Sequence, residues 1–231
     1  MLRELKESLI DYRRLRPHNL NSPEFRHLWY LVFWPLFGLV FQSMEKLWVD
    51  RDWIVVYHPL DDLIPFCELF VIPYVWWFIF LAGMVFFTVL FDRQAFVGLM
   101  KFIMITYGIT LLIYIFFPTM QQLRPVAFER DNLLTRFMAG FYQFDTNTNV
   151  CPSMHVSGGV AVMVTSWNCK LFRRVPWQIY FTVTTVLICI STVFLKQHSV
   201  VDILPSLLLC VVAYPISFPR KNFKHLRQLA N

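Results

Sequence analysis

The residues best suited to chemistry are a histidine and an aspartate that lie four positions apart. His198 and Asp202 follow the end of an apolar run. On a helix, this spacing places both side chains on one face, within reach of each other. A carboxylate beside an imidazole fixes its tautomer and makes the free ring nitrogen a better nucleophile. Because ionisable groups are costly in or near hydrocarbon, we interpret this pair as functional.

Two other short segments carry groups that complement the pair. His155 and Ser153 lie in the run Cys-Pro-Ser-Met-His-Val-Ser-Gly-Gly, residues 151–159, and Arg124 precedes a proline. The planar fork of an arginine can hold two oxygens of one phosphate. Ser153 and the amides of a helix start can donate further hydrogen bonds to an anion. A nucleophile, an acid and such donors are what transfer of a phosphoryl group requires.

The composition indicates that these groups belong to a membrane protein. The chain has 231 residues, of which 57% are hydrophobic and only 16% are charged. A soluble domain usually has about a quarter charged residues. We therefore expect an all-α, polytopic membrane protein with one domain. Six apolar stretches are candidates for its membrane-spanning helices: 28–44, 70–91, 95–117, 152–168, 175–195 and 199–218.

The fourth stretch is short for a membrane span, since a helix needs about 20 residues to cross. Its Gly158-Gly159 pair predicts close packing against a neighbouring helix. Residues 1–27 are basic and contain no secretory signal, and we expect them to form an amphipathic cytoplasmic arm. Residues 219–231 are predicted to be a basic cytoplasmic tail.

The distribution of basic residues predicts the orientation. With six spans and a cytoplasmic N-terminus, fifteen of the 21 Lys and Arg residues fall on the cytoplasmic side. This bias follows the positive-inside rule. It places Arg124, His155 and His198 together at the extracytoplasmic ends of spans three to six. The positive net charge is then a property of the membrane face, and we expect no nucleic-acid partner.

These motifs carry a resemblance to a known family. The run around His155 resembles the Pro-Ser-Gly-His signature of the type 2 phosphatidic acid phosphatase superfamily, whose soluble relatives include vanadium-dependent haloperoxidases. Ser191 to Asp202 is similar to its Ser-Arg-x5-His-x3-Asp signature, and Arg124-Pro125 matches the end of its Lys-x6-Arg-Pro signature. The resemblance covers about residues 28–218 and implies a six-span fold.

Three positions depart from the family pattern. Phe117 stands where the signature has Lys, Thr192 where it has Arg, and Met154 where it has Gly. Two cationic phosphate ligands are therefore missing. Lys196 could replace one charge, and Gln121 and Gln122 could donate neutral hydrogen bonds. These departures favour the branch that resembles sphingomyelin and inositol-phosphorylceramide synthases.

The resemblance also implies roles for individual residues. His198 attacks phosphorus and forms a phosphohistidine, Asp202 orients it, and His155 protonates the leaving alcohol and later activates water or a second alcohol. Arg124, Ser153, Lys196 and Ser191 are the expected phosphate ligands. No metal or other cofactor is expected, and a zinc site from His58, His155 and Asp202 lacks paired Cys/His spacing.

The sequence narrows the substrate, the membrane and the reaction only to a few alternatives. Asp61, Asp62 and Glu68 are possible headgroup contacts near the outer side, and a disulfide between Cys67 and Cys151 stays open. The expected partner is a lipid phosphate within the bilayer, with no obligatory protein partner. Short loops suit a bacterial inner membrane. Hydrolysis of a lipid or isoprenoid phosphate, transfer of a phosphoryl headgroup to a lipid alcohol, and a non-catalytic lipid-binding or transport role are the three hypotheses.

Overall fold

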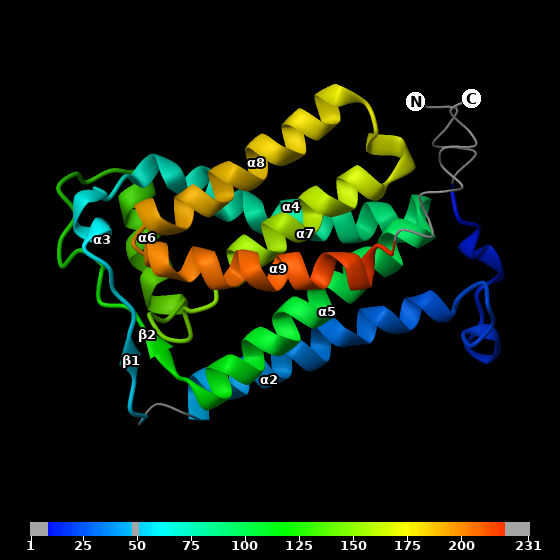
Figure 1. The fold of residues 1–231 in the computed structure, drawn as a ribbon, viewed down its shortest axis with the longest axis horizontal. Coiled ribbons are helices and arrows are strands. Elements are labelled where there is room, and N and C mark those ends of the chain that lie inside the picture. Colours follow the sequence, from blue (N-terminus) through cyan, green and yellow to red (C-terminus); the bar gives the residue numbers. More distant parts are fainter. Residues whose placement is uncertain (1–8, 48–50, 220–231) are drawn as a thin grey trace.

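The structure, a computed structural model, describes residues 9–47 and 51–219, and this part of the chain is almost entirely helical (Figure 1). Two short strands, β1 (Ile54–Val55) and β2 (Thr119–Met120), pair in parallel at one end. The described residues form eight α-helices: α2 (Phe33–Leu47), α3 (Leu60–Leu63), α4 (Val71–Phe91), α5 (Arg93–Phe116), α6 (Leu133–Phe144), α7 (Met154–Asn168), α8 (Val175–Phe194) and α9 (Ile203–Ser217).

Four helical segments are long and apolar enough to cross a membrane, and they indicate an integral membrane protein. They coincide with the second, third, fifth and sixth expected spans. The predicted six-span layout is therefore supported for four of its segments and is not shown for the other two. The four segments are Glu68–Phe91, Arg93–Phe116, Val175–Phe194 and Val200–Ser217.

The remaining two expected spans form shorter α-helices. A 3-10 segment, Arg26–Val32, precedes α2, so regular α-helix begins only at Phe33, two residues before Pro35. Both α2 and α7 have 15 residues. At a rise of 1.5 Å per residue, each is about 22 Å long, less than the ~30 Å of a hydrocarbon core.

Helix α7 is the centre of the bundle, with α4, α5, α8 and α9 packed around it (Figure 1). The close packing expected at Gly158 is confirmed. A Cβ at this position would lie 2.5 Å from Tyr107 Oη and 2.8 Å from Trp77 Nε1. Only a glycine leaves room for these two side chains of α5 and α4 against α7, and they pack against the first turns of α7.

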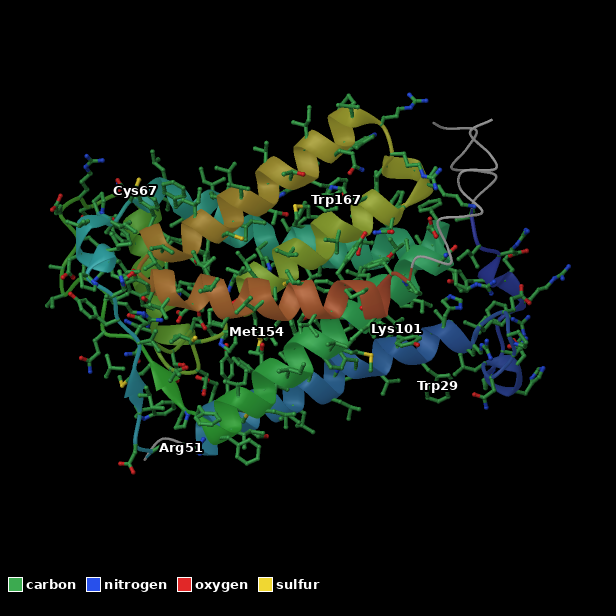
Figure 2. The ribbon with its side chains drawn as sticks, viewed as in Figure 1. Trp29, Arg51, Cys67, Lys101, Met154 and Trp167 are labelled. Carbon is green, nitrogen blue, oxygen red and sulfur yellow. The ribbon has the colours of Figure 1, made fainter. Side chains whose placement is uncertain are left out.

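The two ends of the bundle differ in what they carry. Figure 2 shows Arg51 and Cys67 at one end and Trp29 and Lys101 at the other. Helices α3 and α6 and the strand pair lie at the first end (Figure 1). At the second end, residues 9–25 form two 3-10 turns that pack onto the α4–α5 turn; the predicted amphipathic arm is not a continuous helix there. Residues 1–8 and 220–231 of the predicted arm and tail lie outside the described residues.

Candidate active site

The His198–Asp202 pair is formed, although not within one helix. His198 Nδ1 lies 2.9 Å from Asp202 Oδ2, which also accepts a bond from the Ser199 amide at 3.1 Å. Helix α8 has already ended at Phe194, and Asp202 closes a 3-10 turn, Val200–Asp202. The predicted contact is thus made by a tight turn instead of one helix face.

The turn that presents His198 is held by the end of α8. The amides of Gln197 and His198 both donate to the carbonyl of Thr192, at 3.0 and 3.1 Å. Lys196 has a φ of 53°, in the left-handed region that usually favours glycine or asparagine at a helix end. This reversal directs the chain from α8 into α9 and brings His198 beside the start of α7.

Asp61, in α3, stabilises the turn that contains His198. Its carboxylate is fully buried and accepts bonds from the Ser199 hydroxyl, at 2.5 Å, and the amides of Val200 and His58, both at 2.9 Å. Burying a charge is costly unless it is hydrogen-bonded in this way. Asp61, expected as a headgroup contact, therefore has its oxygens occupied by the loop beside His198.

Ser153 joins the pair to the start of α7. It is the N-cap of this helix, accepting from the amide of Val156 at 3.5 Å, and its Oγ lies 3.2 Å from His198 Nε2. Its own amide donates to the Ser206 hydroxyl at 2.7 Å, and that hydroxyl donates to the Asp202 carbonyl. These bonds fix α7, the His198 turn and α9 relative to one another.

His155 lies in the first turn of α7, and its ring faces that of His198. The two ring centroids are 6.0 Å apart at an interplanar angle of 63°. Tyr74 and Trp77 of α4 each contact the His155 ring with centroids 4.3 Å away. His155 Nε2 is buried and has no hydrogen-bond partner among the described residues. Such an unpaired group is unusual in a protein interior and marks a place where a ligand oxygen can bind.

Arg124 lies in the loop that follows β2, and several oxygens fix its guanidinium group. Nη1 donates to the Tyr142 carbonyl at 2.9 Å, and Nη2 contacts Gln197 Oε1 at 2.6 Å. Nη2 also donates to the carbonyls of Asp145, at 2.8 Å, and Thr146, at 2.7 Å. Nε is buried with no partner in the described part of the chain. In this arrangement Arg124 ties the end of α6 to the His198 turn, and Nε remains available to an anion.

Asp145 is a partly buried carboxylate that the sequence did not point to. Its Oδ2 accepts from Gln197 Nε2 at 3.0 Å and from the Tyr74 hydroxyl at 3.3 Å. Burial raises the pKa of Asp145 above its ordinary value, while His198 and Arg124 oppose this rise. Asp145 thus lies within electrostatic reach of His198 and Arg124. The available signal was its position just after an amphipathic segment, which forms α6.

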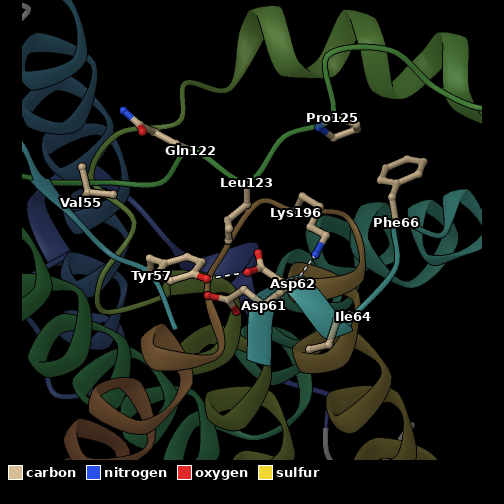
Figure 3. A pocket seen from close by; sticks show the side chains of 10 residues that line it. All are labelled: Val55, Tyr57, Asp61, Asp62, Ile64, Phe66, Gln122, Leu123, Pro125 and Lys196. Carbon is tan, nitrogen blue, oxygen red and sulfur yellow. Dashed lines mark hydrogen bonds between the residues drawn. The ribbon is translucent and has the colours of Figure 1, made fainter. Parts of the chain in front are cut away.

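Lys196 lies on the other side of this turn, in a polar cleft of about 520 Å³ (Figure 3). Its Nζ donates to the Asp61 carbonyl at 2.5 Å. Burial lowers the pKa of Lys196, and Asp61 and Asp62 oppose this effect. Asp62 is exposed and accepts from the Tyr57 hydroxyl at 2.5 Å. The expected ligands Lys196 and Asp62 therefore share a cleft next to the His198 turn, and Lys196 Nζ is turned toward α3.

The other expected contacts lie apart from the paired histidines. Ser191 is buried within α8 and donates its hydroxyl to the Ile188 carbonyl at 2.6 Å. Glu68 accepts from Asn132 at 3.0 Å and pairs with the exposed Arg130 at 3.4 Å. These contacts link Glu68 to the loop before α6. Gln121 and Gln122 do not act alike, since Gln121 is buried and accepts from the Leu123 amide whereas Gln122 lines the cleft.

Cys67 and Cys151 are free thiols in the structure. Burial, and to a smaller extent the nearby charge of Asp202, raises the pKa of Cys151 to about 12. This thiol is therefore neutral at pH 7. Among the described residues, no group of three or more His, Cys, Asp and Glu side chains forms a possible metal site.

A family model described as the PAP2 superfamily matches residues 97–224. The matched region covers more than half of the 231 residues and includes Arg124, His155 and the His198–Asp202 pair. Comparisons with curated proteins and with solved structures gave no match.

Proposed function

Because this chain belongs to the PAP2 superfamily, we propose that it is an integral membrane phosphatase whose substrate is a phosphate ester of a lipid or an isoprenoid carrier. The observation that carries the proposal is the 6.0 Å separation of the His155 and His198 rings, with Asp202 bonded to the remote nitrogen of His198. The two rings are close enough to act on one phosphate ester, with His198 attacking phosphorus as His155 protonates the leaving group.

In the proposed first step, His198 Nε2 attacks phosphorus and the ester bond to the alcohol breaks. Asp202 accepts the Nδ1 proton of His198 in a hydrogen bond, which leaves the lone pair on Nε2. As the phosphohistidine forms, the ring gains positive charge, which Asp202 stabilises. Asp202 is fully buried, so little water screens this interaction.

His155 is the proposed acid and base. Its proton passes to the departing alkoxide, and the neutral ring then takes a proton from the water that attacks the phosphohistidine. Tyr74 stacks on the ring and Trp77 packs against it at a tilt, and the unpaired Nε2 is the nitrogen available for both transfers. Acid–base help of this kind typically accelerates a reaction by about 100- to 10,000-fold.

Phosphate binding is assigned to Arg124, Ser153 and the amides that begin α7. The positive end of the helix dipole favours an anion at this position. Arg124 Nε is a buried donor with no partner among the described residues, and a phosphate oxygen would satisfy it. Ser191 and Lys196 remain weaker candidates, because the hydroxyl of the first and the ammonium group of the second have other partners.

A second candidate function is transfer of a phosphoryl headgroup to a lipid alcohol, as in sphingomyelin and inositol-phosphorylceramide synthases. The polar cleft beside the His198 turn favours it (Figure 3). Asp62 and Tyr57 could bind hydroxyl or amine groups of a headgroup there, with Asp61 and Glu68 supporting the adjacent loops. The two functions share the phosphohistidine and differ in whether water or an alcohol resolves it.

The proposed setting is a bacterial inner membrane, with the histidines on the extracytoplasmic side and both termini in the cytoplasm. The excess of Lys and Arg on the cytoplasmic side of the topology predicted from the sequence supports this orientation. A purely non-catalytic lipid-binding or transport role is less favoured, because His155, His198 and Asp202 are all present and close together.

The test is a substrate panel on the purified chain in lipid nanodiscs, with phosphatidic acid, an isoprenoid diphosphate and a phospholipid donor. Each is supplied with and without a ceramide or diacylglycerol acceptor. A phosphatase releases inorganic phosphate without an acceptor, and vanadate inhibits it. Product formation only with an acceptor would reject hydrolysis in favour of transfer, and no reaction in either arm would reject both.

A further inference from the structure

A second cavity lies at the end of the bundle away from the histidines, and its lining is strongly basic. It has a volume of about 590 Å³. Lys101, one of its lining residues, lies at the opposite end from Cys67 in Figure 2. We call this cavity the basic pocket, and define it by Arg26, His27, Tyr30, Arg93, Lys101 and Ser217.

Three separate segments build the basic pocket. Arg93 Nη1 donates to the carbonyls of Pro23, at 3.1 Å, and Glu24, at 3.2 Å, which fixes the N-terminal segment against the start of α5. The end of α9 approaches α5 at Gly98, where a Cβ would lie 2.3 Å from Phe218 Cε1. This close approach brings Ser217 to the pocket. Contacts between three parts of the chain therefore form this cavity, and it does not depend on surface side chains alone.

Among the described residues, no acidic side chain in the lining neutralises the positive charges of the basic pocket. Arg26, Arg93 and Lys101 line it, and no carboxylate from the described residues does. Among those residues, Arg26 and Lys101 form no ion pair. Like charges that share a cavity repel one another, and an anion between them removes this repulsion.

Two buried polar atoms give independent support for a ligand. Ser217 and His27 both line the pocket and are only 6% and 3% exposed. Ser217 Oγ and His27 Nδ1 have no hydrogen-bond partner among the described residues. Buried polar groups are nearly always paired, so these two atoms indicate a bound group that would complete their bonding. The serine hydroxyl can donate directly to a phosphate oxygen. Burial and the Arg93 charge lower the pKa of His27, so its ring donates only when a bound anion offsets both effects and favours protonation.

We propose that the basic pocket binds a phosphate-bearing anion, either the headgroup of an anionic phospholipid or a soluble phosphate, at a site separate from the catalytic histidines. The chemistry of the lining is that of a phosphate site: guanidinium and ammonium groups with neutral donors. Basic pockets between transmembrane helices are well suited to anionic lipid headgroups. The site requires no catalytic step and stands whether the chain is a phosphatase or a transferase.

The test measures thermal unfolding of the full chain in phosphatidylcholine nanodiscs, with phosphatidylglycerol or inorganic phosphate added separately. The double variant Arg93→Gln/Lys101→Gln removes two pocket charges, and Arg173→Gln/Arg174→Gln removes two elsewhere on the same end. We expect an added anion to raise the unfolding temperature of the wild type and the control, and the pocket variant to need on the order of 20-fold more anion. The same shift is expected in His198→Ala, which separates this site from catalysis.

The two additives identify the source of the phosphate. A shift with phosphatidylglycerol alone assigns a lipid headgroup, and a shift with inorganic phosphate assigns a soluble anion. If the pocket variant and the Arg173/Arg174 control showed the same shift of unfolding temperature at each anion concentration, the shift would come from surface charge in general. That result would overturn the proposal. The absence of a shift with either additive would overturn it as well.

Discussion

The imidazole rings of His155 and His198 lie 6.0 Å apart, although one belongs to the first turn of α7 and the other to the turn after α8. Ser153 spans the two segments, because it caps α7 and also lies 3.2 Å from His198 Nε2. The buried bonds among Ser153, Ser206 and Asp202 hold this relationship in place. The proposed nucleophile and proton donor are thus held close together without a bound substrate, which avoids the entropy cost of bringing them together.

Replacing Asp202 with Asn tests the charge behind His198. Asn keeps the size of the side chain but removes the negative charge that stabilises the imidazolium, and we expect kcat to fall by about 100- to 10,000-fold. Steady-state kinetics on the substrate found in the panel measures this. The matched control is Asp131→Asn, since Asp131 is exposed and bonded to Arg136. An unchanged kcat in Asp202→Asn would remove Asp202 from the proposed mechanism.

Ser153→Ala separates two interpretations of the hydroxyl beside His198. Its distances to His198, and from His198 to Asp202, would also suit a serine nucleophile. We expect Ser153→Ala to lose about 1 kcal/mol of stability through its helix cap and some activity through phosphate binding, yet still to form a phosphoenzyme. Ser157→Ala in the same helix is the control, because within the described ranges the Ser157 hydroxyl bonds only to carbonyls of its own turn. Loss of the phosphoenzyme in Ser153→Ala alone would favour serine as the nucleophile.

Asp145 predicts a pH dependence of stability. Burial raises its pKa above the ordinary 3.8, so between 3.8 and the native pKa the folded state binds more protons than the unfolded state. In this window the free energy of unfolding falls as pH rises. We expect the unfolding temperature of the wild type to decrease as pH rises across this range. In Asp145→Asn this decrease should be absent. Asp131→Asn should keep it; the same slope in all three proteins would exclude Asp145 as its source.

How much of this site the sequence could predict depends on the range of each contact. The His198–Asp202 contact is local, so motif spacing is enough to predict it. Asp145 and Gln197 were missed because their roles come from Tyr74 and Arg124, which are far away in the sequence. Such long-range hydrogen bonds leave no periodic pattern in a single chain.

The helices also differ in whether the sequence predicts them. Hydropathy located α4, α5 and α8 within two residues at each end, because lipid-facing helices are apolar over a membrane-spanning length. The short helix α6 was missed, and regular α-helix in the first stretch begins only at Phe33. The sequence did not predict the burial of Asp61 for a related reason: an acidic side chain in a loop suggests exposure, whereas Asp61 is buried and bonded to Ser199 and Val200.

Gly158→Ala tests the packing that fixes α7. The added methyl would lie 2.5 Å from Tyr107 Oη and 2.8 Å from Trp77 Nε1, and the Trp77 ring also packs against His155. We expect a loss of about 1–3 kcal/mol and lower activity, because the ring support of His155 must shift. Gly108→Ala in α5 meets no atom within 4 Å and should be neutral or stabilising in a thermal unfolding assay. Equal stability of the two variants would show that α7 is not tightly packed there.

The most direct test of the mechanism identifies the phosphorylated atom. In His155→Ala, a phosphate ester with a good leaving group can still react with His198, but hydrolysis of the intermediate slows because its general base is missing. Quenching this reaction in alkali, followed by digestion and mass spectrometry, should find phosphate on His198 in a base-stable, acid-labile bond. The mark should be absent from His198→Ala. Phosphate on Ser153, or a mark that persists without His198, would contradict the account.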